Sequence, residues 1–161
     1  MRILITGGCG FLGSNLASSF LSKDYEVFII DSMERLGSEE NLNWLKSKDL
    51  RNNLSFNQLN IIDSESINLF FQKFSKFDYI CHVAGQVAMT TSINNPRKDI
   101  ETNVMGTFNI LEAMRKYSPE ALLAFSSTNK VYGDLEWIDI VENDLRYCLK
   151  NYPNGLDETI P

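Results

Sequence analysis

The stretch Ile5-Thr6-Gly7-Gly8-Cys9-Gly10-Phe11-Leu12-Gly13 joins a short apolar run to a segment with helical periodicity. Its glycines Gly7, Gly10 and Gly13 are spaced three residues apart. In a strand–loop–helix unit, the first such glycine permits a tight turn, the second lets the backbone approach a pyrophosphate, and the third lets helix and strand pack closely. The helix N-terminus adds unpaired amides and the positive end of a dipole. The stretch therefore predicts a dinucleotide-binding turn.

An acidic residue, Asp31, ends the next apolar run, 18 residues after Gly13. A carboxylate at the end of the second strand can accept hydrogen bonds from the adenosine ribose hydroxyls, and it repels a 2′-phosphate. The pattern thus favours NAD over NADP as the cofactor. Arg35 follows closely and would soften that preference.

Strand-like and helix-like segments alternate along the first 126 residues. The long last helix is expected to start at Pro96, to end near Tyr117 and to bury Ile100, Val104, Phe108 and Leu111 as its inner stripe. Strands are predicted at Arg2–Thr6, Tyr25–Asp31, Leu54–Gln58, Asp78–Val83 and Ala121–Ser126, and the earlier helices at Phe11–Ser22, Glu39–Lys46 and Ser64–Ser75. Short apolar strands alternating with amphipathic helices indicate an α/β fold, a Rossmann-type doubly wound parallel sheet.

The pattern fades after Ser126, which divides the chain into a nucleotide-binding core at 1–126 and a segment at 127–161. The second part is polar and rich in turn residues, with one weak apolar patch at Leu135–Val141. A tail of this length without clear elements is unusual in a complete domain. We therefore expect a chain that stops partway through a larger protein and leaves apolar surface on its sheet uncovered.

Composition narrows the function classes. The 161 residues carry a net charge of −6, and the pI is about 4.8, which argues against a general nucleic-acid surface. An apolar run of about 18 residues, as a membrane span needs, does not occur in the sequence. The cysteines Cys9, Cys81 and Cys148 are odd in number and far apart, so they predict neither a zinc site nor a disulfide framework. This cysteine usage favours a reducing, cytoplasmic compartment and no bound metal.

Four stretches resemble the extended short-chain dehydrogenase/reductase family of nucleotide-sugar enzymes. They are Ile5–Ser18, Ala84–Ser92, Asn103-Val104-Met105-Gly106-Thr107 and Ser126-Ser127-Thr128-Asn129-Lys130-Val131-Tyr132-Gly133-Asp134-Leu135-Glu136. The likeness is strongest to epimerases that act at C2 of a CDP-linked hexose. It implies NAD as the cofactor, a nucleotide-sugar substrate of the CDP-hexose type, and transient oxidation at C2 followed by return of the hydride. It also implies a homo-oligomer in the full-length form, and the composition given above predicts no nucleic-acid or membrane partner.

The resemblance assigns roles along the cofactor. The backbones of Phe11 and Leu12 would contact the pyrophosphate, Asn103 would fix the structure near the cofactor, and Ala84, Gly85 and Gln86 would line it. Asn60 and Ile61 occupy the place beside the adenine where the family usually has Asp-Ile or Asp-Val. Asn60 keeps a side-chain carbonyl that can accept from the adenine amino group, but it loses the charge.

The resemblance also bears on the chemistry. Thr128 stands where the family places its catalytic Ser or Thr. The next residues, Asn129 and Lys130, replace the Asp-Glu pair of the family's sugar dehydratases, so epimerisation is favoured over dehydration. His82 is the single histidine and is interpreted as a hydrogen-bonded core residue, and Cys9 as a small residue required by packing.

The family's Tyr-x-x-x-Lys motif is missing: none of the six tyrosines has a lysine four residues on, and Tyr147 precedes Lys150 by only three. In the family this Tyr is the general base, and the Lys lowers its pKa. We therefore expect a chain truncated before its catalytic helix, without a sugar-binding domain and inactive alone. Two alternatives stay open: another NAD-dependent nucleotide-sugar epimerase, such as a 4-epimerase, and a non-catalytic nucleotide-binding remnant.

Overall fold

The computed structural model describes residues 1–157, 159 and 160, and the chain forms two compact units, 1–126 and 127–161. The first unit contains a five-stranded sheet in the order β3-β2-β1-β4-β5, and every neighbouring pair is parallel. The strands are β1 (Arg2–Thr6), β2 (Glu26–Asp31), β3 (Leu54–Gln58), β4 (Tyr79–His82) and β5 (Leu122–Phe125). The predicted doubly wound sheet is confirmed. Because the strand order reverses between β1 and β4, a crevice opens at their carboxyl ends.

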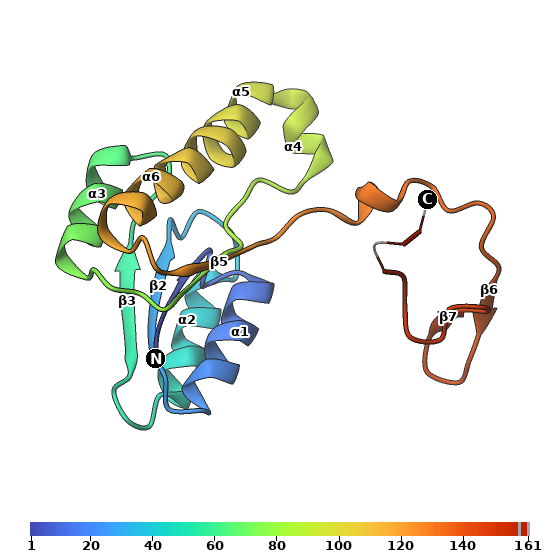
Figure 1. Cartoon of the computed structure of the whole chain (residues 1–161), viewed down its shortest axis with the longest axis horizontal. Helices are drawn as coiled ribbons and strands as arrows, with labels where there is room; N and C mark the ends of the chain where they lie inside the picture. Colours follow the sequence, from blue (N-terminus) through green and yellow to red (C-terminus); the bar gives the residue numbers. More distant parts are fainter. Residues whose placement is uncertain (158, 161) are drawn as a thin grey trace. The chain divides into compact units, whose positions relative to one another are not determined.

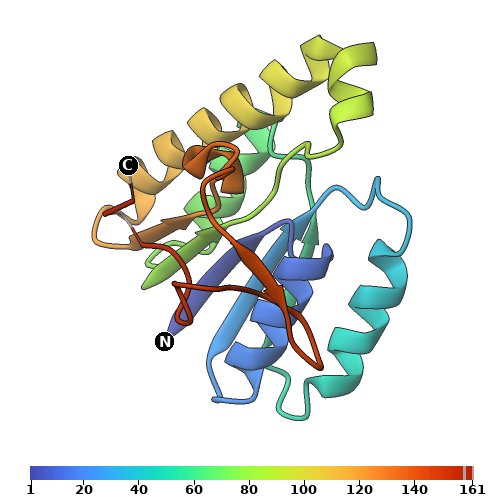
Figure 2. The ribbon, with the colours of Figure 1, turned by 90° about the vertical axis from the view of Figure 1, so that its right-hand side faces the viewer.

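Helices cover both faces of this sheet (Figures 1 and 2). The helices α1 (Phe11–Leu21) and α2 (Ser38–Lys48) pack on one face, and α3 (Ser64–Lys73) and α6 (Thr107–Tyr117) on the other. Alternate side chains of β1 point to opposite faces of the sheet. Ile3 and Ile5 pack in the core under α1 and α2, and Leu4 packs in the core under α3 and α6.

Aromatic side chains fill the layer under α3. Phe70 and Phe71 of the helix contact Phe77 with ring centroids 6.1 and 5.6 Å apart, and Phe28 of β2 lies 5.3 Å from the same ring. These residues are buried, and α3 lies within the helix predicted at Ser64–Ser75. The Phe70–Phe77 pair is stacked and the other two pairs are edge-on, and such pairs add to the free energy gained by burying the rings.

The long last helix is continuous but mixed in type: α5 (Pro96–Asp99) passes into a π-helical segment, η1 (Ile100–Gly106), and then into α6. The predicted inner stripe is wrong, since Ile100, Val104, Phe108 and Leu111 are all exposed. The buried face instead carries Asn109, Ile110 and Ala113.

The physical reason lies in the hydrogen bonds of Asn109. The Asn109 amide donates to the carbonyls of Ile61 and Ile62, at 2.9 and 3.2 Å, so a polar residue is satisfied on the buried face. Sequence periodicity instead favoured the larger apolar residues on the opposite side. The six-residue α4 (Met89–Asn94), which precedes α5, was not predicted.

An apolar groove of about 650 Å³ lies beside α1, on the same face of the sheet as this helix. Leu12, Leu16 and Phe20 of the helix form one side of it. The strands contribute Ile3, Tyr79, Cys81, Ala124 and Phe125. The sheet of the first unit therefore carries an apolar surface on this face, as expected.

The second unit contains a 3₁₀ turn, η2 (Asn129–Tyr132), and an antiparallel hairpin of β6 (Ile140–Glu142) and β7 (Tyr147–Leu149). The hairpin corrects the expectation that 127–161 lacks elements. Trp137 and Tyr152 meet edge to face at 6.1 Å within this unit. Tyr147 lies on a strand, as expected of a residue outside a catalytic helix.

Two features are absent from residues 1–157, 159 and 160. Within these residues, no helix is long and apolar enough to cross a bilayer. The described part of the chain also brings together no group of three His, Cys, Asp or Glu side chains that could hold a metal ion.

Candidate functional site: a nucleotide pocket

The glycine loop lies at the point where the strand order reverses. Gly7 has φ +69°, a conformation that side chains with a Cβ rarely adopt, and its amide donates to the carbonyl of Ile30 at 2.7 Å. A Cβ on Gly7 would lie 2.8 Å from the Cα of Ala84. The loop after β1 is thus packed directly against the segment after β4, at the mouth of the crevice.

The next two glycines differ in what they contact. A Cβ on Gly13 would overlap with the carbonyl oxygen of Gly7 and lie 2.8 Å from the Cα of Gly8, so this glycine sets the distance between α1 and the loop. Gly10 caps α1 with ordinary φ of −75° and lines the pocket. The first amides of α1, including those of Phe11 and Leu12, have no carbonyl one turn earlier to bond, so they form an anion-binding end.

Asp31 is held by the backbone around it. Its Oδ2 accepts from the amide of Cys9 at 2.9 Å, and its Oδ1 accepts from the amide of Met33 at 2.9 Å. Asn41 of α2 donates to the carbonyl of Cys9 at 2.8 Å and fixes the loop from the other side. Because an ionised carboxylate has about four acceptor positions, Asp31 retains capacity for ribose hydroxyls.

Cys9 itself has a packing role, as predicted. Its side chain is fully buried in the core under α1 and α2. Burial, with a further contribution from the charge of Asp31, raises the pKa of the Cys9 thiol to about 12. A thiol with this pKa is protonated at neutral pH and unreactive.

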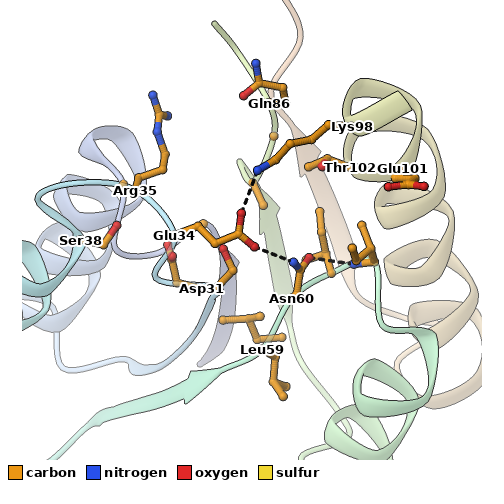
Figure 3. Close-up of a pocket in the computed structure, with 18 of the residues that line it drawn as sticks. Asp31, Glu34, Arg35, Ser38, Leu59, Asn60, Gln86, Lys98, Glu101 and Thr102 are labelled. Carbon is orange, nitrogen blue, oxygen red and sulfur yellow. Dashed lines mark hydrogen bonds and ion pairs between the residues drawn. The ribbon is translucent and has the colours of Figure 1, made fainter. Parts of the chain in front are cut away.

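A pocket of about 340 Å³ opens between these loops (Figure 3). It brings together eight of the residues predicted to contact the cofactor: Gly7, Gly10, Asp31, Asn60, Ile61, Ala84, Gly85 and Gln86. Phe11, Leu12 and Gly13 lie beside the pocket at the start of α1. Asn103 acts through a pocket residue, as described next.

Asn103 clamps the segment after β4. Its Oδ1 accepts from the amide of Gln86 at 2.8 Å, and its Nδ2 donates to the carbonyl of the same residue at 3.0 Å. Asn103 lies in the middle of η1, and π-helical turns occur frequently at functional sites. The geometry agrees with the positioning role that the resemblance implies.

Two charged residues that sequence reasoning did not select, Glu34 and Lys98, also line the pocket. Lys98 Nζ lies 2.9 Å from Glu34 Oε2, and Asn60 Nδ2 donates to Glu34 Oε1 at 3.0 Å (Figure 3). The pair joins the loop after β2 to α5 across 64 residues of sequence. No local pattern signals a contact over that separation.

His82 has the structural role predicted for it. Its Nδ1 lies 2.6 Å from Thr6 Oγ1 and its Nε2 2.9 Å from Thr107 Oγ1, while the side chain is almost fully buried. Burial lowers the pKa of His82 to about 4. The ring is therefore neutral at physiological pH and links β1 to α6.

Thr128 belongs to the second unit, where its carbonyl accepts from the amide of Val131 at 3.4 Å. The side chains of Asn129 and Lys130 lie outside what the structure describes. The catalytic role of Thr128 therefore stays a prediction.

The pocket residues fit a dinucleotide. A side chain at Gly7 would fill the narrow space between the loops after β1 and β4. The unpaired amides at the start of α1 lie beside the pocket. Asp31 lines the pocket at the end of β2, where a dinucleotide places its adenosine ribose. Together with the strand order, these features define a Rossmann-type nucleotide-binding unit.

Comparison with known proteins narrows this class. Residues 4–153 match the family model described as GDP-mannose 4,6 dehydratase. Because the match covers most of the sequence, the chain belongs to this family, one of NAD-dependent epimerases and dehydratases of nucleotide sugars.

Individual relatives point to epimerases. CDP-paratose 2-epimerase of Salmonella typhi is 47% identical over 159 residues, covering 99% of this chain and 46% of that protein. A bifunctional UDP-glucose 4-epimerase and UDP-xylose 4-epimerase of Pisum sativum is 35% identical, covering 88% of this chain and 41% of that protein. The crystal structure of Thermus thermophilus UDP-glucose 4-epimerase in complex with NAD matches with a TM-score of 0.67 and 32% identity, over 80% of this chain and 38% of that one. The chain thus spans less than half the length of these relatives.

Proposed function

We propose that this chain is the NAD-binding part of a nucleotide-sugar epimerase of the CDP-paratose 2-epimerase type. The observation that carries the proposal is the 47% identity to that enzyme over nearly the whole chain, combined with a pocket that holds the glycine loop and Asp31 together. The Thermus thermophilus relative, whose structure contains NAD, supports the choice of cofactor.

In this proposal the chain binds and orients the cofactor. The amides at the start of α1 hold the pyrophosphate, and the absence of side chains at Gly7 and Gly10 lets the backbone approach it. Asp31 accepts from the adenosine ribose and disfavours a 2′-phosphate. Asn103 keeps the backbone of Gln86 fixed beside the cofactor.

When bound, NAD supplies reversible hydride transfer, so that C2 of the hexose can be oxidised and then reduced on its opposite face. Thr128 would hydrogen-bond the sugar hydroxyl at that carbon. Asn129 and Lys130 carry no carboxylate for eliminating water, which supports epimerisation over dehydration. The substrate in this proposal is a CDP-linked hexose, and the enzyme works in the cytoplasm.

Two measurements test the proposal. Isothermal titration of the 161-residue chain should give binding of NAD and much weaker binding of NADP. The full-length protein incubated with CDP-paratose should invert C2, as followed by NMR of the sugar. An unchanged C2 configuration would contradict the substrate assignment. A chain that does not bind NAD would contradict the cofactor assignment.

Two other functions retain specific support. A UDP-sugar 4-epimerase is favoured by the 35% identity to the Pisum sativum enzyme, and it predicts turnover of UDP-glucose rather than CDP-paratose. A non-catalytic nucleotide-binding protein would use the same pocket, because the glycine loop and Asp31 can hold the cofactor whether or not a sugar is turned over. It predicts that the full-length protein binds NAD but turns over neither sugar. The epimerase proposal predicts turnover by the full-length protein and none by residues 1–161 alone.

We also propose that the full-length protein self-associates. Ile100, Val104, Phe108 and Leu111 form an exposed apolar stripe along the outer side of the long helix. Contiguous exposed apolar patches on a protein surface mark protein–protein contacts. Analytical ultracentrifugation should show concentration-dependent association, and a monomer at every concentration would contradict the proposal.

A further inference from the structure

The adenosine end of the pocket contains a polar bridge made of Glu34, Lys98 and Asn60 (Figure 3). Glu34 follows the ribose-side residue Asp31 by three positions, and Asn60 follows the end of β3. In a doubly wound sheet, the carboxyl ends of β2 and β3 lie on the adenosine side of the dinucleotide. The bridge therefore stands where the adenine ring has to be recognised.

The orientation of the Asn60 amide is fixed by its two neighbours. Its Oδ1 accepts from the backbone amide of Ile62 at 3.2 Å, and its Nδ2 donates to Glu34 at 3.0 Å. A flipped amide would bring an NH₂ group against the Ile62 N–H and an oxygen against the Glu34 carboxylate. Asn60 therefore turns its donor, rather than its carbonyl, toward Glu34.

Asn60 is neutral, so the negative charge of the bridge lies on Glu34. Lys98 lies 2.9 Å from Glu34 and balances that charge. Both side chains of the ion pair are about half exposed, at 49% and 45%, so the carboxylate stays accessible to a ligand. It retains acceptor positions beyond the two already used.

We propose that Glu34, positioned by Asn60 and Lys98, is the residue that accepts from the exocyclic amino group of the adenine. Adenine presents this amine as a donor beside a ring nitrogen that accepts. The bridge offers the complementary pair, a carboxylate acceptor beside the Asn60 amide donor. Hypoxanthine carries a carbonyl oxygen in place of the amine, which would face the carboxylate without a proton between them. This inference rests on the proposed binding of NAD.

The test compares NAD with nicotinamide hypoxanthine dinucleotide by isothermal titration of the 161-residue chain. The wild-type chain should prefer NAD by about tenfold or more. Glu34→Ala should weaken NAD and reduce the preference to nearly one. Glu112→Ala is the matched control, because it removes the same charge from a residue outside the pocket, one paired with Arg115 on α6 and not with the bridge. Its preference for NAD should stay as in the wild type.

A rescue variant makes the test sharper. Glu34→Ala combined with Asn60→Asp returns a carboxylate to position 60 and should restore the preference for NAD. Equal binding of both dinucleotides by the wild type, or a preference that survives in Glu34→Ala, would overturn the inference and leave NAD binding in place. Tighter NAD binding by Glu34→Ala would also overturn it, since the Glu34–Lys98 pair would then be an obstruction. A wild-type chain that binds neither dinucleotide would overturn the proposed function together with this inference.

Discussion

The backbone amide of Cys9 donates a hydrogen bond of 2.9 Å to Oδ2 of Asp31. Through this bond, the two features that mark the site in the sequence, the glycine loop and the acidic end of β2, form one structural unit. The carboxylate is oriented before any ligand arrives, because its other oxygen is held by the amide of Met33. A preorganised acceptor loses less entropy on binding than a freely rotating one.

The first prediction concerns the charge at this position. Asp31→Asn leaves one acceptor oxygen for two backbone amides and removes the repulsion of a 2′-phosphate. NAD affinity should fall about tenfold, the preference for NAD over NADP should narrow, and the free energy of unfolding should fall by about 1–2 kcal/mol. Titration calorimetry and urea unfolding measure these changes. Asp63→Asn is the control: Asp63 caps α3 through the Ser66 amide, and Asn caps a helix equally well. Equal loss of NAD affinity in both variants would contradict the prediction.

The second prediction separates two glycines of the same loop. Gly13→Ala drives a methyl group into the backbone of Gly7 and Gly8, so the free energy of unfolding should fall by about 1–3 kcal/mol. Gly10→Ala has ordinary φ and one near contact, 3.3 Å from the carbonyl of Gly7, so the fold should tolerate it with about 1 kcal/mol or less. Its methyl group would nevertheless weaken NAD binding, because Gly10 lines the pocket. Thermal unfolding and titration calorimetry together distinguish the two variants. Similar unfolding curves for both would show that the Gly13 contact is unimportant.

The third prediction concerns the clamp on Gln86. Asn103→Leu removes both hydrogen bonds to the Gln86 backbone, and Asn103→Asp keeps the acceptor but loses the donor. The Gln86 amide should exchange its hydrogen faster in the leucine variant, and the free energy of unfolding should fall by about 1–2 kcal/mol. The aspartate variant should be intermediate. Asn68→Leu on the exposed face of α3 provides the control, since its amide bonds only within its own helix. Unchanged exchange at Gln86 in Asn103→Leu would show that other contacts hold this segment.

The fourth prediction is a pH dependence of stability caused by His82. The pKa of His82 is about 4 in the folded chain, and the ordinary pKa of histidine is 6.5, so below pH 6.5 the unfolded chain binds a proton that the folded chain does not. Stability should therefore be fully present above pH 6.5 and fall as the pH drops toward 4, by about 3 kcal/mol in total. Urea unfolding at pH values between roughly 4 and 7.5 measures how the free energy of unfolding changes with pH. His82→Gln removes the single titrating imidazole and should flatten the curve above pH 5, where most carboxylates are still ionised. An equally steep curve in that variant would assign the dependence to other groups.

Local sequence patterns were sufficient to predict the main strands and helices of the first unit. The glycine spacing, the apolar runs and Asp31 predicted β1, α1 and β2, and β1 and β3 begin and end at the predicted residues. These elements are defined by residues adjacent in sequence, whose propensity and periodicity agree with their final environment. For the same reason, eight of the residues predicted to contact the cofactor lie in one pocket.

Features that depend on distant contacts were missed. Asn109 is buried because the carbonyls of Ile61 and Ile62, far away in sequence, accept from its amide, so the buried face of α6 was predicted on the wrong side. The ion pair of Glu34 and Lys98 likewise exists only after the chain has folded. The hairpin of β6 and β7 has strands of three residues, too short for an alternating pattern to be recognised.

The π-helical segment η1 gives the long helix two rotational phases. Asn103 within it points to Gln86, while Ile110 and Ala113 beyond it point into the core. A π turn accommodates more residues than an α turn, so deleting one residue between 100 and 106 would return the helix to a single phase. The helix would then satisfy either the clamp or the core. A one-residue deletion here is accordingly far more destabilising than the same deletion in a surface loop. The fold therefore requires this helix to keep its number of residues unchanged.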